Sequence, residues 1–288
     1  MNLLDNLNKN QLEAVKIIDG PALVIAGAGS GKTKVLTTRI ANLILNNVLS
    51  SNILAITFTN KAAKEMKERL EALVPNNYAF VGTFHSFGLK IIRENAEKLN
   101  LMRNFTILDS DDVTSLIKKI MKKNGYDIKD VAPGYVRNRI SFIKNEMLSN
   151  EEIEKFFNTP PEKIAYQIYK NYQETLKKNN SVDFDDLLLL PVKLFRENKE
   201  ILEKYQDKYK YILIDEYQDT NEVQYRLTKL LAKKYKNKNV YLKLPRVNMK
   251  YPFYENENLL KVTKQRIKVN TLRAFLEKTN KRNTLEQF

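Results

Sequence analysis

A glycine-rich loop between an apolar run and a helical pattern constrains this chain of 288 residues more than any other stretch. The apolar run covers 22–26, and the loop ends in Lys32 and Thr33. Glycines let consecutive backbone N–H groups curl around a polyphosphate, the lysine reaches the outer phosphates, and the threonine hydroxyl ligates Mg²⁺. The following helix adds free N–H groups and a dipole that favour an anion. The residues of this predicted nucleoside triphosphate site are Ala26 (where the strict pattern has Gly), Gly27, Ala28, Gly29, Ser30, Gly31, Lys32 and Thr33.

A second informative stretch is an acidic loop that follows the apolar strand pattern at 211–214. In a parallel sheet, ligands bind at the carboxyl ends of the strands, so this loop and the glycine-rich loop are expected at the same edge. Asp215 is predicted to hold Mg²⁺, and Glu216 to orient and deprotonate an attacking water. The predicted chemistry is phosphoanhydride hydrolysis, with Lys32, Asp215 and Glu216 as catalytic residues and Thr33 and Asp215 as magnesium ligands.

The order of strand and helix patterns predicts an α/β fold. Apolar strand patterns at 53–57 and 78–82 are each followed by an amphipathic helical pattern, the second of which runs to about Leu99, and this favours a parallel sheet flanked by helices. Helical patterns alone continue from Asp109 to about Asn180, with a capping box of Ser149 and Glu152 and a helix start at Pro160, as expected of an all-helical insertion. The predicted domains are 1–108 with 184–244 for the α/β domain, 109–183 for the insertion and 245–288 for a basic extension.

Composition excludes several classes of site. The chain has no cysteine and a single histidine, His85, which excludes disulfides, Fe–S clusters, cysteine-ligated zinc and chemistry that needs two histidines. Its apolar runs are too short to span a bilayer, and its first residues begin no signal peptide. We therefore expect a cytoplasmic protein that has no membrane partner.

The charge distribution favours a polyanionic partner. The net charge is +15, with 12 basic and four acidic residues from Asn237 onward, so this last stretch carries +8. A Lys-rich and Asn-rich composition can also reflect background sequence bias, and a single charge in the insertion is more often part of a solvated face.

Six short motifs occur in order: L-N-x-x-Q, A-G-A-G-S-G-K-T, T-F-T-N-K-A-A, G-T-F-H-S-F, D-F-D-D-L and I-D-E-Y-Q-D-T-N. Together they resemble the UvrD/PcrA/Rep group of superfamily 1 DNA helicases over about 1–236. The resemblance implies a RecA-like P-loop NTPase domain with a helical insertion, ATP and Mg²⁺ as cofactors, and 3′ to 5′ movement on DNA. It implies single-stranded DNA or a junction with duplex DNA as the partner, and a full-length helicase or another DNA repair protein as a further one.

The resemblance also assigns residues. Gln11 would contact adenine and Arg39 the nucleotide region. The residues placed on the single-stranded DNA path are Phe58, Thr59, Asn60, Thr83, Phe84, His85 and Phe184. From the residues alone, Gln11 is more often a solvated helix-start residue, and a lone histidine is more often packed or capping.

The chain departs from the family pattern after a helix predicted over 222–236. The segment 239–245 lacks the glutamine and the aromatic residue of the family's next motif, and no glycine follows Gly134. We therefore expect no second RecA-like domain, and no unwinding by this chain alone, because an arginine from a facing domain contributes ~10³- to 10⁵-fold to turnover. Two other hypotheses remain open, a regulatory or vestigial module that binds DNA or a helicase without turnover, and a small-molecule kinase. The extension at 245–288 is either a product of frame change or truncation, or a basic arm.

Overall fold

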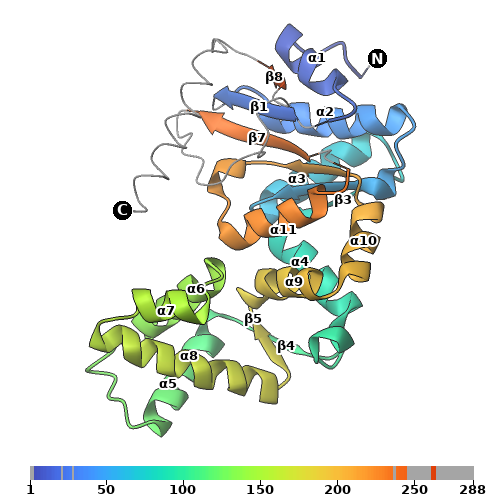
Figure 1. Ribbon diagram of the computed structural model, residues 1–288. Helices are drawn as coiled ribbons and strands as arrows, with labels where there is room; N and C mark the ends of the chain where they lie inside the picture. The colour runs from blue at the N-terminus through green and yellow to red at the C-terminus, as the bar shows by residue number, and fades with distance from the viewer. Residues whose placement is uncertain (1–2, 21, 28, 236–237, 245–260, 264–288) are drawn as a thin grey trace. The chain divides into compact units, whose positions relative to one another are not determined.

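The computed structural model describes residues 3–20, 22–27, 29–235, 238–244 and 261–263 (Figure 1). The chain forms two compact units. The first comprises Met1–Thr83, Glu203–Thr220 and Leu231–Phe288, and the second comprises Phe84–Leu202 and Asn221–Leu230.

The first unit is built on a parallel sheet. Its strands are β1 Ala22–Gly27, β2 Ile53–Thr57, β3 Phe80–Thr83, β6 Tyr211–Ile214, β7 Lys238–Leu244 and β8 Lys261–Thr263. They lie in the order β3-β2-β6-β7-β1-β8, and every pair is parallel. The segment at 239–244, for which the sequence did not decide whether a strand forms, thus belongs to a strand between β6 and β1. The predicted parallel α/β fold is confirmed.

Three helices of the first unit share one apolar core with the sheet: α1 Lys9–Lys16, α2 Lys32–Leu45 and α3 Asn60–Leu73. Val35, Leu36, Ile40 and Leu43 of α2 recur at helical spacing and are buried, because that spacing places them on one face. Burial of this face fixes the start of α2, and with it the end of the glycine-rich loop.

The second unit is largely helical. Its helices are α4 Phe84–Glu94, α5 Ser110–Lys123, α6 Pro133–Asn145, α7 Asn150–Phe156, α8 Pro160–Lys178, α9 Asp186–Glu197 and most of α11 Glu222–Ala232. The helices α5 to α8 have an apolar core of their own. The predicted capping box of Ser149 and Glu152 begins α7, and Pro160 begins α8.

The structure differs from the sequence expectations in several elements. The helix expected to run to about Leu99 ends at Glu94 and gives way to a 3₁₀ turn at Ala96–Leu99; the side chain of Asn95 donates to the Ile91 carbonyl oxygen at 2.8 Å. The helix expected over 222–236 ends at Ala232, and α10 Lys199–Lys208 precedes β6.

Two short parallel strands, β4 Thr106–Leu108 and β5 Ser181–Asp183, flank the insertion and were not expected. In the predicted basic extension, 245–260 and 264–288 lie outside the described residues. The described helices include none that is long and apolar enough to cross a membrane.

Candidate nucleotide and nucleic-acid site

The glycine-rich loop has the backbone conformation that its glycines allow. Gly29 and Gly31 have φ values of +73° and +80°, a left-handed region that other residues rarely adopt. Helix α2 begins directly after Gly31, so the free N–H groups of its first turn lie at the loop. Ala28 lies outside the described residues, and Ala26 and Gly27 are described only as the end of β1. The described part of the loop fits an anion at the start of α2.

Gln11 connects α1 to this loop. Its backbone N–H donates to Asn8 Oδ1 at 2.9 Å and its Oε1 accepts from the Asn8 N–H at 3.1 Å, which forms a capping box at the start of α1. Its Nε2 donates to the Ser30 carbonyl oxygen at 2.9 Å. The side chain therefore lies at the glycine-rich loop. To make the predicted contact with adenine, its amide would have to give up these hydrogen bonds.

The acidic loop begins where β6 ends. The Asp215 N–H donates to the Ile56 carbonyl oxygen at 2.9 Å, and its carboxylate accepts from the Glu216 N–H at 3.0 Å. Glu216 has a φ of +47°, which costs a residue with a Cβ about 1–2 kcal/mol. Gln218 Nε2 donates to Glu216 Oε2 at 2.5 Å. Gln218 thus holds the side chain of the predicted base. This role was not predicted, because the sequence shows only that Gln218 lies two residues after Glu216.

Charges link the two loops. Burial and the neighbouring Glu216 charge raise the pKa of Asp215 to about 6, while the Glu216 N–H and the charge of Lys32 act in the opposite direction. Asp215 and Lys32 are both buried, with 7% and 9% of their surfaces exposed. Asp215 follows β6, and Lys32 begins α2 after the loop that follows β1. Although β7 lies between β6 and β1 in the sheet, the two side chains interact electrostatically.

The residues present fit Mg²⁺ bound together with phosphate. The described residues contain no group of three or more His, Asp or Glu side chains that could hold a metal alone. Mg²⁺ commonly binds through one or two carboxylates together with phosphate oxygens and water. Asp215 supplies a buried carboxylate, and Thr33 supplies a half-buried hydroxyl in the first turn of α2.

Arg39 lies in the interior of the first unit. Its side chain is fully buried, and Nη1 donates to the Ala14 carbonyl oxygen at 2.6 Å. This bond ties α2 to α1, a structural role that the sequence did not indicate. The nucleotide contact implied by the resemblance stays a prediction.

The predicted DNA residues of the first unit differ in accessibility. Phe58 is half-buried and Asn60, the first residue of α3, is exposed. Thr59 caps that helix by accepting the Ala62 N–H at 3.1 Å. Thr83 is buried at the end of β3.

The second unit supplies an aromatic pair. Phe184 is 55% exposed, and its ring centroid lies 5.4 Å from that of His85. Burial lowers the pKa of His85 while Asp185 acts in the opposite direction. Phe84, in contrast, is 1% exposed, so its ring supports this region from the core and does not face solvent.

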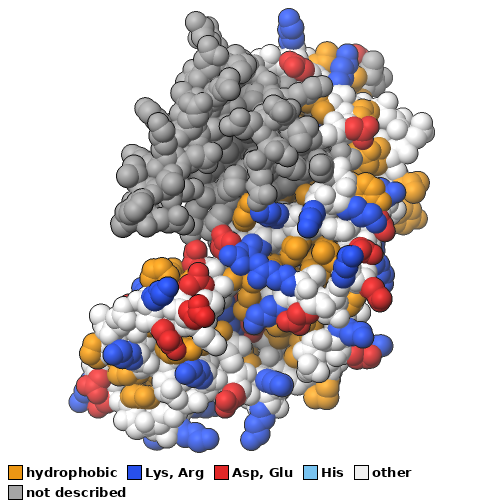
Figure 2. All heavy atoms as spheres, in the orientation of Figure 1, with side chains coloured by type: hydrophobic (Ala, Val, Ile, Leu, Met, Phe, Trp, Pro, Cys, Tyr) orange, Lys and Arg blue, Asp and Glu red, His pale blue; other side chains and the backbone are white. Residues whose placement is uncertain are grey.

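A group of Lys and Arg side chains lies beside α9 and α11 on the face drawn in Figure 2. Arg196 of α9 and Arg226 of α11 are close enough to interact electrostatically: burial and the charge of Arg226 lower the pKa of Arg196, while Glu222, which pairs with Arg226, acts in the opposite direction.

Comparisons with known proteins show the family of the chain. Residues 7–243 match the description UvrD/REP helicase N-terminal domain. Two similar relatives are the ATP-dependent DNA helicases PcrA of Staphylococcus epidermidis (strain RP62A) and Staphylococcus aureus (strain Mu50), 48% and 46% identical over 238 residues. The match covers 82% of this chain and 33% of each relative, so it spans about a third of their length. The chain belongs to the UvrD/REP helicase family and corresponds to its N-terminal domain.

Proposed function

We propose that this chain is the ATP-binding and single-stranded-DNA-binding portion of a helicase that moves 3′ to 5′. The observation that carries the proposal is the electrostatic proximity of Lys32 and Asp215 at the carboxyl edge of the parallel sheet. A lysine after a glycine-rich loop and a carboxylate at the end of a nearby strand are the parts that hold a nucleoside triphosphate.

Each residue at the site would have its own task. Lys32 and the first N–H groups of α2 would bind the outer phosphates of ATP. Asp215 and Thr33 would hold Mg²⁺, which neutralises phosphate charge when bound. Glu216, kept in place by Gln218, would orient the attacking water and take its proton.

The nucleic-acid partner follows from exposed aromatic and basic groups. Phe184 and His85 offer rings on which bases can stack, and a group of Lys and Arg side chains lies beside α9 and α11 (Figure 2). A single-stranded segment, alone or at a junction, presents unstacked bases and phosphates together. A full-length helicase or another repair protein is the protein partner we propose.

ATP hydrolysis by the purified chain, with and without single-stranded DNA, tests the proposal, and Glu216→Gln is the control. We expect weak binding of both ligands and slow turnover that depends on Glu216. DNA-stimulated turnover that is lost in the control would identify a working motor. Binding without any turnover would favour a regulatory module, and phosphate transfer to a nucleoside would favour a kinase.

A further inference from the structure

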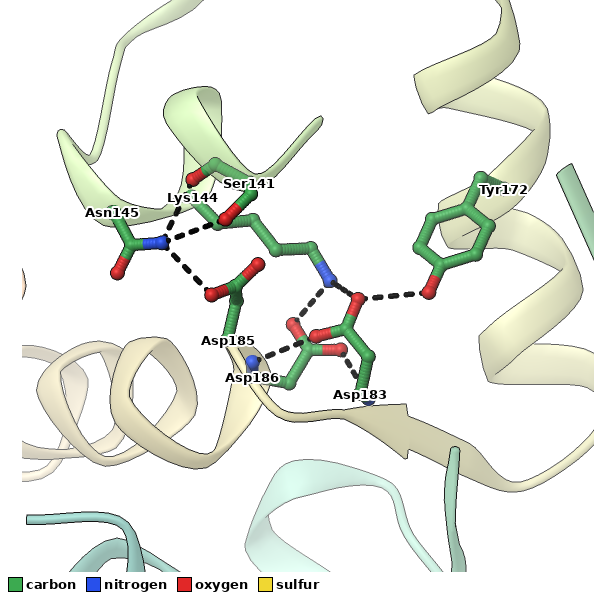
Figure 3. Close-up of polar contacts among 7 residues, drawn as sticks. All are labelled: Ser141, Lys144, Asn145, Tyr172, Asp183, Asp185 and Asp186. Atoms are coloured by element: carbon green, nitrogen blue, oxygen red, sulfur yellow. Dashed lines mark hydrogen bonds and ion pairs between the residues drawn. The ribbon is translucent and has the colours of Figure 1, made fainter. Parts of the chain in front are cut away.

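Two adjacent residues of α6 hold a short turn between β5 and α9. Lys144 Nζ lies 2.6 Å from Asp183 Oδ2 and 2.8 Å from Asp186 Oδ1. Asn145 Nδ2 donates to Asp185 Oδ1 at 2.8 Å. Figure 3 shows the Lys144 and Asn145 side chains directed toward the three carboxylates. Three of the four residues in the turn 183–186 are therefore bound to α6.

The turn is also closed on itself. The Asp183 N–H donates to Asp186 Oδ2 at 3.2 Å, and the Asp186 N–H donates to Asp183 Oδ1 at 2.9 Å. Tyr172 of α8 donates its hydroxyl to Asp183 Oδ2 at 2.8 Å (Figure 3). Because these bonds fix both ends of the turn, its backbone has little freedom to reorient.

The contacts between α6 and the turn are charge-assisted. Burial lowers the pKa of Lys144, but the charges of Asp186 and Asp183 raise it more, so the ammonium keeps its proton. Ile140 and Ile143 bury the same helix in the core of the insertion. The position of α6 therefore sets the position of the turn.

The remaining residue of the turn is Phe184, whose ring is half-exposed and lies beside His85. Asp183 and Asp185 on either side of it are both held by α6. A rigid support lowers the entropy that an aromatic ring loses when a base stacks on it.

We propose that Lys144 and Asn145 are positioning residues for single-stranded DNA binding, which hold the turn 183–186 so that Phe184 is presented for base stacking. This inference rests on the proposed DNA-binding function. Neither residue needs to touch the nucleic acid for this effect. The helical insertion then acts on DNA affinity through its contacts with the turn, and not only through its own surface.

A double-mutant cycle on the full chain tests the inference. The measurement is the affinity for a fluorescent oligothymidylate by anisotropy, for wild type, Asn145→Ala, Phe184→Ala and the double variant. Loss of one stacking contact is expected to weaken binding about 5- to 150-fold in Phe184→Ala. Asn145→Ala should weaken binding at least about threefold by itself and have no further effect in the Phe184→Ala background.

The matched control is Asn171→Ala. Asn171 Nδ2 donates to Asn124 Oδ1 at 3.0 Å, a bond between helices of the insertion that does not involve the turn. This variant should leave DNA affinity unchanged. Thermal unfolding checks that each variant is folded. If Asn145→Ala is not folded, the isosteric Asn145→Asp, whose carboxylate would repel Asp185, should give the same pattern.

The possible outcomes separate the two proposals. A wild-type chain that does not bind the oligonucleotide would overturn the proposed DNA binding and this inference with it. A chain that binds, and loses affinity in Phe184→Ala, but is unchanged by the Asn145 variants would overturn the inference alone. Equal losses from Asn145→Ala in both backgrounds would also overturn it, since the effect would then not pass through Phe184.

Discussion

Asp215 at the nucleotide site and Asp186 next to α6 are both buried, and the pKa of each is raised to about 6. Their surroundings differ. Asp186 shares the Lys144 ammonium with Asp183, at 2.8 Å from Asp186 and 2.6 Å from Asp183, whereas Asp215 is influenced by the charges of Glu216 and Lys32 and accepts a hydrogen bond from the Glu216 N–H. A raised pKa alone therefore does not identify a cation site. Asp186 belongs to a paired cluster, and the magnesium site that we infer at Asp215 rests on Lys32 and Thr33 in the first turn of α2.

The largest effect expected from this comparison is at Lys144. Lys144→Met leaves Asp183 and Asp186 buried without their cation, which should lower the free energy of unfolding by about 3–5 kcal/mol. Denaturant unfolding measures the loss. Lys90→Met removes a partly exposed pair with Glu94 and should cost only about 0–1 kcal/mol. Equal losses in the two variants would contradict the paired-cluster account.

Substitution of a glycine by alanine should lower stability by different amounts in the two units. A Cβ at Gly88 of α4 would lie 1.9 Å from the Leu187 carbonyl oxygen of α9, so Gly88→Ala should cost about 1–3 kcal/mol or more. A Cβ at Gly29 of the glycine-rich loop would have nothing within 4 Å, but Gly29 has a φ of +73°. Gly29→Ala should therefore cost only about 1–2 kcal/mol of backbone strain. The order of the two midpoints in thermal unfolding checks this, and Gly134→Ala, with nothing within 4 Å, is the control.

Neutralising Asp215 and neutralising Asp183 should change stability in opposite directions, because their pKa values are shifted in opposite directions. Because the pKa of Asp215 is raised from 3.8 to about 6, the folded chain holds this proton more tightly than the unfolded chain. The penalty of the ionised group is absent below about pH 4 and complete above about pH 6. Asp215→Asn should therefore stabilise the metal-free chain by on the order of 1 kcal/mol at pH 7 and not at pH 4.

Asp183→Asn should instead destabilise the chain at pH 7. Burial raises the pKa of Asp183, but the charge and hydrogen bond of Lys144 lower it below its ordinary value, so the ionised group stabilises the fold at neutral pH. Thermal unfolding of both variants at pH 4 and pH 7 in a chelator distinguishes the two directions. Stabilisation by both substitutions at pH 7 would show that the aspartates share one environment.

The smallest effect is expected at Glu216. Its left-handed backbone is strained for a residue with a Cβ, so Glu216→Gly should stabilise the folded chain by about 1 kcal/mol while it removes the proposed base. Asn47 has a φ of +66°, a conformation that asparagine tolerates, so Asn47→Gly should gain less. An equal or larger gain at Asn47 in the same unfolding assay would refute strain at the acidic loop.

Patterns with a clear period or a cap could be predicted from the sequence. The strand at 53–57 and the start of α7 at Ser149 agree with the structure because alternation of elements and a capping box are local signals. The three-residue strands β4 and β5 are too short to show any period. The end of α4 at Glu94 was missed because apolar spacing continues through the 3₁₀ turn that follows.

Contacts between distant residues could not be predicted. Lys144 and Asp183 lie 39 positions apart, and the sequence marks Lys144 only as a charge in a helical region. The motif D-F-D-D-L does not show that Asp185 and Asp186 bind side chains of α6. Likewise, nothing in the pattern around Arg39 shows that its guanidinium is buried against α1.

The most direct test of the nucleotide site is calorimetric titration of the chain with ATP, with and without Mg²⁺, for wild type and Lys32→Ala. A charged hydrogen bond to phosphate contributes about 1.5–3 kcal/mol, so Lys32→Ala should weaken Mg-ATP binding about 10- to 150-fold. Omission of Mg²⁺ should also weaken binding by the wild type. Equal affinity of wild type and Lys32→Ala for ATP, in the presence of Mg²⁺, would contradict the account of this site.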